Sequence, residues 1–142
     1  MYTTGSFSPD SIDAARERYE TLGPAAQTVV REVTRAMEFD REEYNDRVSS
    51  EVIETARDAL FASMLSVRVG TREEYAEWLE DYAGEVTETG HESVDSVAWH
   101  AGPDGEAVAA TFQNEEDAAV ATLRRQAFGR LYRDRLEDRR SS

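Results

Sequence analysis

The apolar residues of the chain change their spacing near Leu65. Before that point they recur every three or four residues, which is the repeat of a helix with one buried face. The stretch LSVRVG at 65–70 instead alternates apolar and polar side chains and ends in a glycine, which is typical of a short strand. The change predicts an α+β fold in which a helical half precedes a half that contains a sheet.

Local start and stop signals divide the helical half into four predicted helices. Ser8 followed by Pro9 is a helix start, with a hydroxyl cap and a proline at the first helical position. We expect the pair Gly23-Pro24 to end this helix and to begin the next. The third helix begins at Asp40, with Glu43 three residues later, and the fourth is capped by Ser49 or Ser50.

The second half contains the predicted sheet. Thr71 and Glu74 form a capping box for a helix with the sequence REEYAEWLEDYA. The stretch EVTET predicts a second strand, and residues 93–101 and 107–113 predict a hairpin around the turn GPDG. Asn114 is expected to cap the last helix. We therefore predict N-terminal helices packed with a small, three- to four-stranded, mostly antiparallel sheet and a long C-terminal helix.

We expect these elements to form one domain over residues 1–142. Its helical half covers about residues 8–64, its α+β half covers about residues 65–136, and the ends are short and disordered. A chain of 142 residues can bury a substantial core. Two subdomains are the alternative, although pieces of about 60 to 80 residues are marginal for independent cores.

The charge of the chain indicates its environment. It holds 30 Asp and Glu residues and 16 basic residues, all of them arginine, with a formal net charge of −14. Such a surface repels itself at low ionic strength, whereas at about 1 M salt the Debye length of about 3 Å screens the repulsion. Arginine keeps its charge and is more weakly hydrated than lysine. An acidic, lysine-free composition is typical of a halophilic, cytosolic protein of the haloarchaea.

Several classes of site are absent from the sequence. No apolar run approaches the roughly 20 residues of a membrane span, and the first residues lack the pattern of a signal peptide. We therefore expect a cytoplasmic protein that does not contact a membrane. There is no cysteine, and two histidines are too few for a dedicated metal cage, so we expect no metal and no cofactor.

The sequence also argues against an enzyme. It has no glycine-rich phosphate loop, no nucleophile elbow and no visible set of nucleophile, base and oxyanion donors, so we expect no catalytic residue. The alternative is a small enzyme with a site at the hairpin that carries His100. Neighbouring side chains on a strand point to opposite faces, and we expect Trp99, rather than His100, to face the core. His91 follows Gly90 in a predicted loop.

The arginines gather at the end of the chain. Residues 1–123 hold 27 acidic residues and 9 arginines, whereas residues 124–142 hold 3 acidic residues and 7 arginines. Arginine and aromatic side chains together are enriched at the centres of protein interfaces. The last helix is therefore a candidate surface for an acidic partner protein or for a second copy of the chain. The candidate binding residues are Arg124, Arg125, Phe128, Arg130, Tyr132 and Arg133.

An intramolecular role for these arginines is the alternative. Cations near a helix C-terminus interact favourably with its dipole, and arginines bind carboxylates elsewhere in a domain. Gly129 lies inside the same predicted helix, where glycine costs about 1 kcal/mol relative to alanine. We expect a neighbour that packs closely against the backbone at that position.

Part of the second half resembles an RNA-recognition motif. The stretch ATFQNEEDAA is similar to the third strand and second helix of that family, with Phe112 at its structural phenylalanine, and the element order implies a ferredoxin-like topology. Ala109 and Ala110 stand where the family has stacking aromatics, and the acidic body repels phosphate. An RNA-binding module is therefore kept as an alternative, and nucleic acid is not the expected partner.

A second resemblance covers nearly the whole chain, roughly from Gly5 to Asp134. With the segments LGPAAQTVVREV, ARDALFASML and LRRQAFGRLYRD, the sequence resembles a haloarchaeal family of small acidic proteins of unknown function. The resemblance implies a halophilic protein of the cytoplasm. It brings no catalytic residue, substrate or cofactor. From the residues themselves, we expect a non-enzymatic protein-interaction module.

Overall fold

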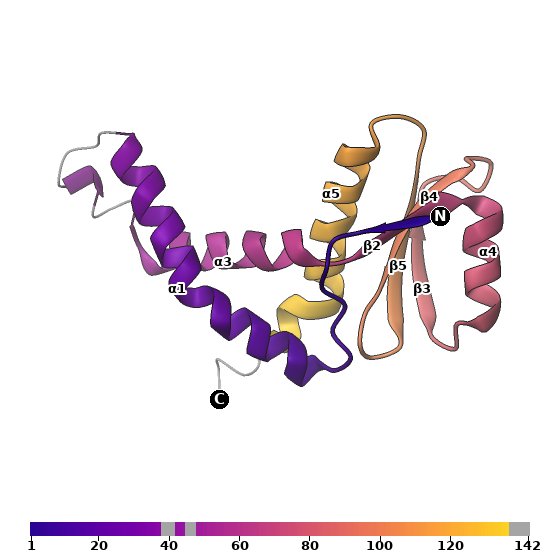
Figure 1. Cartoon of the computed structure of the whole chain (residues 1–142), viewed down its shortest axis with the longest axis horizontal. Helices are drawn as coiled ribbons and strands as arrows, with labels where there is room; N and C mark the ends of the chain where they lie inside the picture. The colour runs from indigo at the N-terminus through magenta and orange to yellow at the C-terminus, as the bar shows by residue number, and fades with distance from the viewer. Residues whose placement is uncertain (38–41, 45–47, 137–142) are drawn as a thin grey trace.

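The computed structural model describes residues 1–37, 42–44 and 48–136 (Figure 1). Its elements, in chain order, are β1 (Tyr2–Thr4), α1 (Ile12–Ala36), α3 (Ser50–Met64), β2 (Val67–Thr71), α4 (Arg72–Asp81), β3 (Glu85–Thr89), β4 (Ser96–Ala101), β5 (Glu106–Phe112), α5 (Glu116–Ala127) and the π-helical turn η1 (Phe128–Tyr132). The predicted α+β class is confirmed. None of the helices in these described ranges is long and apolar enough to cross a membrane.

The sheet has five strands in the order β1-β2-β4-β5-β3. Only β3 and β5 pair in parallel, so the mostly antiparallel character is confirmed. The hairpin of β4 and β5 around GPDG and the strand EVTET lie where the sequence predicts them. The prediction missed β1, because a strand of three residues is too short to show alternation.

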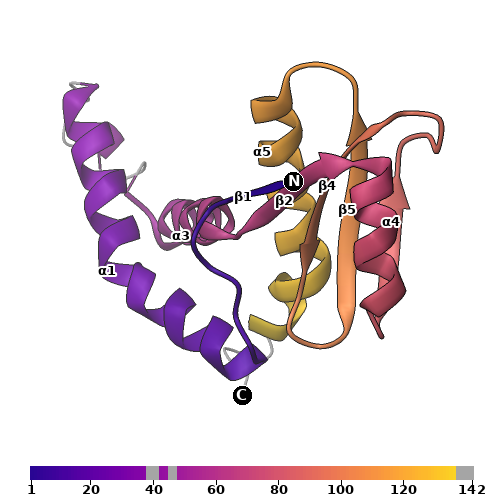
Figure 2. The ribbon, with the colours of Figure 1, turned by 45° about the vertical axis from the view of Figure 1, so that its right-hand side comes forward.

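Helices cover both faces of this sheet. Figure 2 shows α4 on one side and α5 on the other, with α3 beyond α5. Tyr75 of α4 packs with Val97, Trp99 and Ala109 of the central strands. Leu123 and the other buried side chains of the last helix pack with α3 and with the opposite faces of β2, β4 and β5.

The two covered faces correct two expectations. Trp99 and His100 are both buried, on opposite faces of β4, although we expected only one of them to face a core. The ferredoxin-like topology is wrong, because three strands separate α4 from α5 and these helices lie on opposite faces. An RNA-recognition motif needs a sheet face on which aromatics stack against bases. The part of the chain that the structure describes leaves no such face open.

The predicted break at Gly23-Pro24 is wrong, because α1 is one continuous helix with Pro24 inside it. Proline removes one backbone hydrogen bond from a helix interior. α1 nevertheless packs along α3, with Ala15 and Tyr19 in the same core cluster as Phe61. The pair Gly23-Pro24 therefore does not end the helix.

The start of α1 also differs from the prediction. Its N-cap is Ser11, whose hydroxyl accepts a hydrogen bond from the N–H of Ala14 at 3.1 Å, instead of Ser8. The segment before it is held extended, because Phe7 exchanges backbone hydrogen bonds with Met64 and Ser66 at 2.9 and 2.8 Å. A long-range contact therefore moves the helix start.

Four other helix starts were predicted from local signals. Ser49 caps α3, as one of the two alternatives held, and the capping box of Thr71 and Glu74 at α4 is confirmed. Asn114 is not the cap of α5, because the chain turns at Glu115, whose φ of 56° is left-handed and which takes the cap position itself. The predicted third-helix cap, Asp40, lies outside the described residues.

Candidate functional site

The last helix runs from α5 through η1 to Leu136 and is mostly a core element. Phe128 is 4% exposed and Tyr132 is fully buried. Both rings pack against Phe61 of α3, with ring centres 5.7 and 5.3 Å away. These two residues of the predicted binding surface therefore contact the protein's own interior and are not available to a partner.

Arg124 is also engaged inside the molecule. It is half-buried, and its Nε donates a hydrogen bond to the carbonyl oxygen of Leu65 at 2.9 Å. This bond joins the last helix to the end of α3. The intramolecular alternative holds for this arginine, with a backbone carbonyl as the acceptor instead of a carboxylate.

Arg135 is the second arginine of this helix with partners inside the fold. Its side chain forms an ion pair with Asp104 in the turn between β4 and β5. Its carbonyl oxygen accepts hydrogen bonds from Arg16 of α1 at 3.0 and 3.2 Å. The end of the last helix is thus fixed to both halves of the chain.

Among the candidate binding residues, the exposed arginines are Arg125, Arg130 and Arg133. Arg125 donates a hydrogen bond to the hydroxyl of Thr122 at 3.3 Å, and the guanidinium of Arg133 lies 5.3 Å from the ring centre of Phe128. Within the described residues, none of the three forms an ion pair with a carboxylate. They are outward-facing cations on a chain with 30 acidic residues.

The expectation of a close neighbour at Gly129 is wrong. A side chain built there would meet only the guanidinium of Arg133, at 4.0 Å, so the backbone faces open space. The space continues into a groove of about 370 Å³ between the last helix and the edge strand β3. The groove is lined by Thr87, Thr89, Val108, Gln126, Gly129 and Arg130.

The π-helical turn η1 contributes buried side chains to the core and lining residues to the groove. Phe128, Leu131 and Tyr132 are all buried, although they lie within one five-residue turn that also carries Gly129 and Arg130. A π-turn inserts one residue into the helical repeat, and such turns are frequent at functional sites. The turn therefore places the open glycine beside an exposed arginine while the aromatics stay inside.

The sequence did not point to the β3 side of this groove. Thr87 and Thr89 alternate along EVTET, which indicates that they share one face of the strand. Which helix lies above that face depends on the parallel pairing of β3 with β5, and this pairing joins segments about 20 residues apart in the chain. No local pattern in the sequence predicts that pairing.

His100 has partners at both ring nitrogens. Nδ1 donates to the carbonyl oxygen of Ser66 at 2.6 Å, and Nε2 accepts a hydrogen bond from the hydroxyl of Tyr132 at 2.7 Å. This assignment follows because a carbonyl oxygen can only accept. Burial lowers the pKa of His100, the bond to Ser66 opposes this shift, and the nearby cations Arg124 and Arg68 lower the pKa further. Burial also raises the pKa of Tyr132, so both side chains are neutral.

This arrangement does not support the enzyme alternative at the hairpin. A general base needs a free nitrogen within reach of a substrate and a group that orients it. Both nitrogens of His100 are occupied, and a cavity beside the ring has no carboxylate among the described residues that line it. His100 joins β4 to the last helix in the interior.

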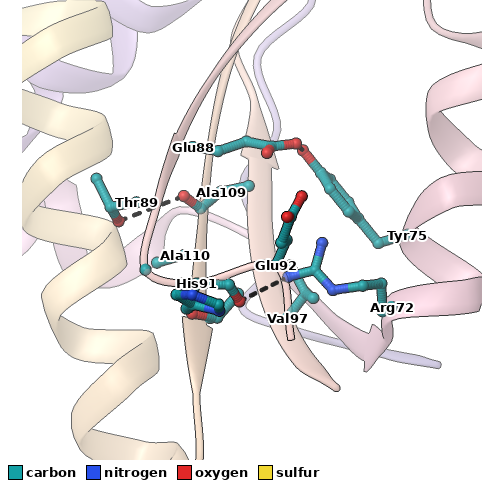
Figure 3. A pocket seen from close by; sticks show the side chains of 11 residues that line it. Arg72, Tyr75, Glu88, Thr89, His91, Glu92, Val97, Ala109 and Ala110 are labelled. Atoms are coloured by element: carbon teal, nitrogen blue, oxygen red, sulfur yellow. Dashed lines mark hydrogen bonds between the residues drawn. The ribbon is translucent and has the colours of Figure 1, made fainter. Parts of the chain in front are cut away.

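His91 lies at a second, smaller cavity beside α4 (Figure 3). Arg72 donates hydrogen bonds to the carbonyl oxygens of Val94 and His91, both at 3.1 Å, and the hydroxyl of Tyr75 donates to Glu88 at 2.5 Å. Burial raises the pKa of Tyr75, and Glu88 adds to the shift. The cavity of about 30 Å³ has room for roughly one water molecule. The two hydrogen bonds from Arg72 hold the loop between β3 and β4 against α4.

We also searched the described residues for clusters of metal ligands. Across residues 1–37, 42–44 and 48–136, no group of three or more His, Asp or Glu side chains could hold a metal ion.

Comparison with known proteins gives one match. The model of a family described as a family of unknown function (DUF5809) matches residues 6–133, which is nearly the whole chain. No curated protein matches the chain, and no solved structure matches it.

Proposed function

The chain belongs to this family of unknown function, and we propose that it is a protein-interaction module that binds an acidic, extended segment of a partner protein at the groove beside Gly129. The observation that carries the proposal is the set of exposed arginines on the last helix, Arg125, Arg130 and Arg133. Arg130 lines the groove, and the guanidinium of Arg133 lies 4.0 Å from where a side chain of Gly129 would begin. The guanidinium groups of the three arginines have no carboxylate partner within the described residues.

Arginine recognises carboxylates through two parallel hydrogen bonds, which require direct contact and a fixed geometry. The rest of the chain is strongly acidic and repels an acidic partner at a distance. In about 1 M salt this repulsion is screened beyond about 3 Å. Under these conditions, direct hydrogen bonds between the arginines and the carboxylates of the partner determine the affinity.

The groove supplies contacts that do not depend on charge. Val108 forms an apolar wall of the groove, and Thr87 and Thr89 contribute hydroxyl groups. Gly129 has no side chain, so it leaves the space beside its backbone unfilled. β3 is an edge strand, so one row of its backbone groups is unpaired in the sheet. An extended segment binds such an edge through main-chain hydrogen bonds and places alternate side chains in neighbouring pockets.

We also propose that this interaction takes place in the cytoplasm of a halophilic cell. The support is the composition: 30 acidic residues, no lysine and a formal net charge of −14. Because arginine is more weakly hydrated than lysine, it forms direct ion pairs more readily in brine.

The test uses a labelled synthetic peptide of alternating Glu and Val and a matched peptide of alternating Gln and Val, measured by fluorescence anisotropy in molar KCl. We expect saturable binding of the Glu peptide and a loss of at least about tenfold in affinity, or about 1.4 kcal/mol, for the double variant Arg130→Glu/Arg133→Glu. The control is Arg31→Glu/Arg35→Glu, which makes the same charge change on the exposed face of α1.

Equal binding of the two peptides, or equal losses in the two double variants, would contradict the proposal. Sedimentation equilibrium measures whether the free protein forms dimers. A dimer that Arg130→Glu/Arg133→Glu dissociates would show that the occupant of the groove is a second copy.

A further inference from the structure

The cavity beside His100 lies toward the β1 edge of the sheet, whereas the groove lies at the β3 edge. The cavity has a volume of about 290 Å³ and lies where the segment after β1 crosses the start of β2 and the end of β4. Its lining residues are Thr3, Gly5, Ser6, Ser8, Ser66, Arg68, Trp99, His100 and Ala101. Hydroxyl-bearing residues and one arginine therefore line the cavity, and none of the lining residues is acidic.

The hydroxyl groups at this cavity are not used by the fold. Ser6 and Ser66 hydrogen-bond through their backbone N–H groups, to Met64 and Phe7. No hydrogen bond of the hydroxyls of Ser6, Ser8 or Ser66 is found to any part of the chain that the structure describes. These groups can serve as donors to a ligand.

The local charge is positive, in contrast to the chain as a whole. Arg68 lies with its guanidinium carbon 5.9 Å from the ring centre of Trp78 and forms no ion pair with any described carboxylate. Arg124 lies behind the wall at Gly5, where an added side chain would come within 2.8 Å of its Nη2. Both cations lower the pKa of His100, in addition to the effect of burial.

We propose that this cavity binds a small metabolite through an oxyanion group, either a phosphate or a carboxylate. Arg68 supplies the charge and a bidentate contact, and the hydroxyls of Ser6, Ser8 and Ser66 supply further donors. The volume exceeds that of a bare ion and approaches the lower limit of small-molecule pockets, about 300 Å³. His100 also lines the cavity, but both of its ring nitrogens are already hydrogen-bonded inside the protein, so we assign it no proton transfer.

This inference does not depend on the proposed function. The acidic peptide is assigned to Arg125, Arg130, Arg133 and the β3 side of the last helix, whereas the oxyanion is assigned to Arg68 and the β1 side of the sheet. Variants at one site leave the other site intact, so each proposal can fail alone.

The test uses the chain's two tryptophans, Trp78 and Trp99, which both lie beside Arg68. Intrinsic fluorescence is titrated with inorganic phosphate and, separately, with acetate, at constant KCl and pH, and the heat of binding is measured in parallel by calorimetry. We expect saturable binding of one of the two anions and an affinity at least tenfold lower in Arg68→Gln. We expect a severalfold loss in Ser66→Ala. The matched control, Arg31→Gln on the exposed face of α1, should bind as the unchanged protein does.

Phosphate and acetate distinguish the two sources of the oxyanion. The absence of saturable binding of either anion, or equal binding by Arg68→Gln and the unchanged protein, would overturn the proposal. Circular dichroism checks each variant, and if Arg68→Gln does not fold, Ser6→Ala and Ser66→Ala decide the question, since each removes only a hydroxyl. Unchanged affinity in both serine variants would then count against the site.

Discussion

The hydroxyl of Tyr132 and Nε2 of His100 are 2.7 Å apart inside the core, and this hydrogen bond joins the π-helical turn to strand β4. Both side chains are almost fully buried. Neither partner can turn to water, so the bond fixes the last helix against the sheet.

Replacing Tyr132 by phenylalanine tests this bond. Tyr132→Phe keeps the ring that packs on Phe61 but leaves Nε2 of His100 buried without a donor. An unsatisfied buried group costs about 1–3 kcal/mol, and we expect the free energy of unfolding to fall by that amount. Urea denaturation in molar KCl measures it. The control is Tyr75→Phe, which removes a hydroxyl whose partner, Glu88, is exposed and can bind water. Equal losses in both variants would contradict the role of His100.

The same pair predicts how stability depends on pH. Burial holds the pKa of His100 below its ordinary value of about 6.5, so the unfolded chain binds a proton that the folded chain excludes. The contribution of His100 is therefore complete above about pH 6.5 and is lost as the pH falls below that value. We expect the free energy of unfolding to decline between about pH 6.5 and pH 5, above the range in which most carboxylates titrate.

Two variants isolate this effect. His100→Gln removes the titrating group and should flatten the pH dependence in that window, at the expense of some stability. The control is His91→Gln, which removes the other histidine of the chain, in the exposed loop between β3 and β4; equal flattening in both variants would contradict the assignment to His100. The measurement is urea denaturation at each pH, in constant salt. A slope that persists in His100→Gln would assign it to another group.

Gly129→Ala tests whether the space beside the backbone of Gly129 is open or filled by a neighbour. Gly129 lies within helical structure, and an added methyl group meets only one guanidinium nitrogen at 4.0 Å. Alanine is favoured over glycine in helices by about 0.5–1 kcal/mol. We therefore expect Gly129→Ala to raise the free energy of unfolding by about that much, as measured by thermal or urea denaturation. Destabilisation would show that a neighbour occupies the space, as the sequence alone suggested.

The sequence predicts features of this fold that depend on nearby residues. The capping box of Thr71 and Glu74 spans three residues, and the turn GPDG has Gly105 at a φ of 78°, which glycine adopts without strain. Both were predicted correctly. The helix break at Pro24 was not, because α1 packs along α3, distant in sequence, and continues through Pro24.

The candidate site also depends on contacts between segments that are distant in sequence. Composition predicts that arginines matter at the chain's end, but it cannot distinguish the outward Arg130 from Arg124, which donates to Leu65. Arginine and aromatic residues occur together in the last helix, but Phe128 and Tyr132 pack on Phe61 of α3, a contact between segments distant in sequence. The cavity at Arg68 depends on three chain segments that meet in space, so no local pattern points to it.

The acidic surface predicts that the fold needs salt. At low ionic strength, repulsion among carboxylates opposes the compact state, and molar salt screens it. We expect the helical circular dichroism signal to fall as KCl is reduced from molar to millimolar concentration and to return when KCl is restored. A signal that stays constant across this range would show that the fold tolerates its own charge.

A pair of variants assigns the salt requirement to charge. Glu73, Glu77 and Glu80 are exposed on α4, at spacings of four and three residues, where like charges repel. Glu73→Gln/Glu77→Gln/Glu80→Gln should lower the KCl concentration at which half of the protein unfolds. Arg31→Gln makes the body more negative and should raise it. If both changes moved the midpoint in the same direction, helix propensity rather than electrostatic repulsion would explain the response.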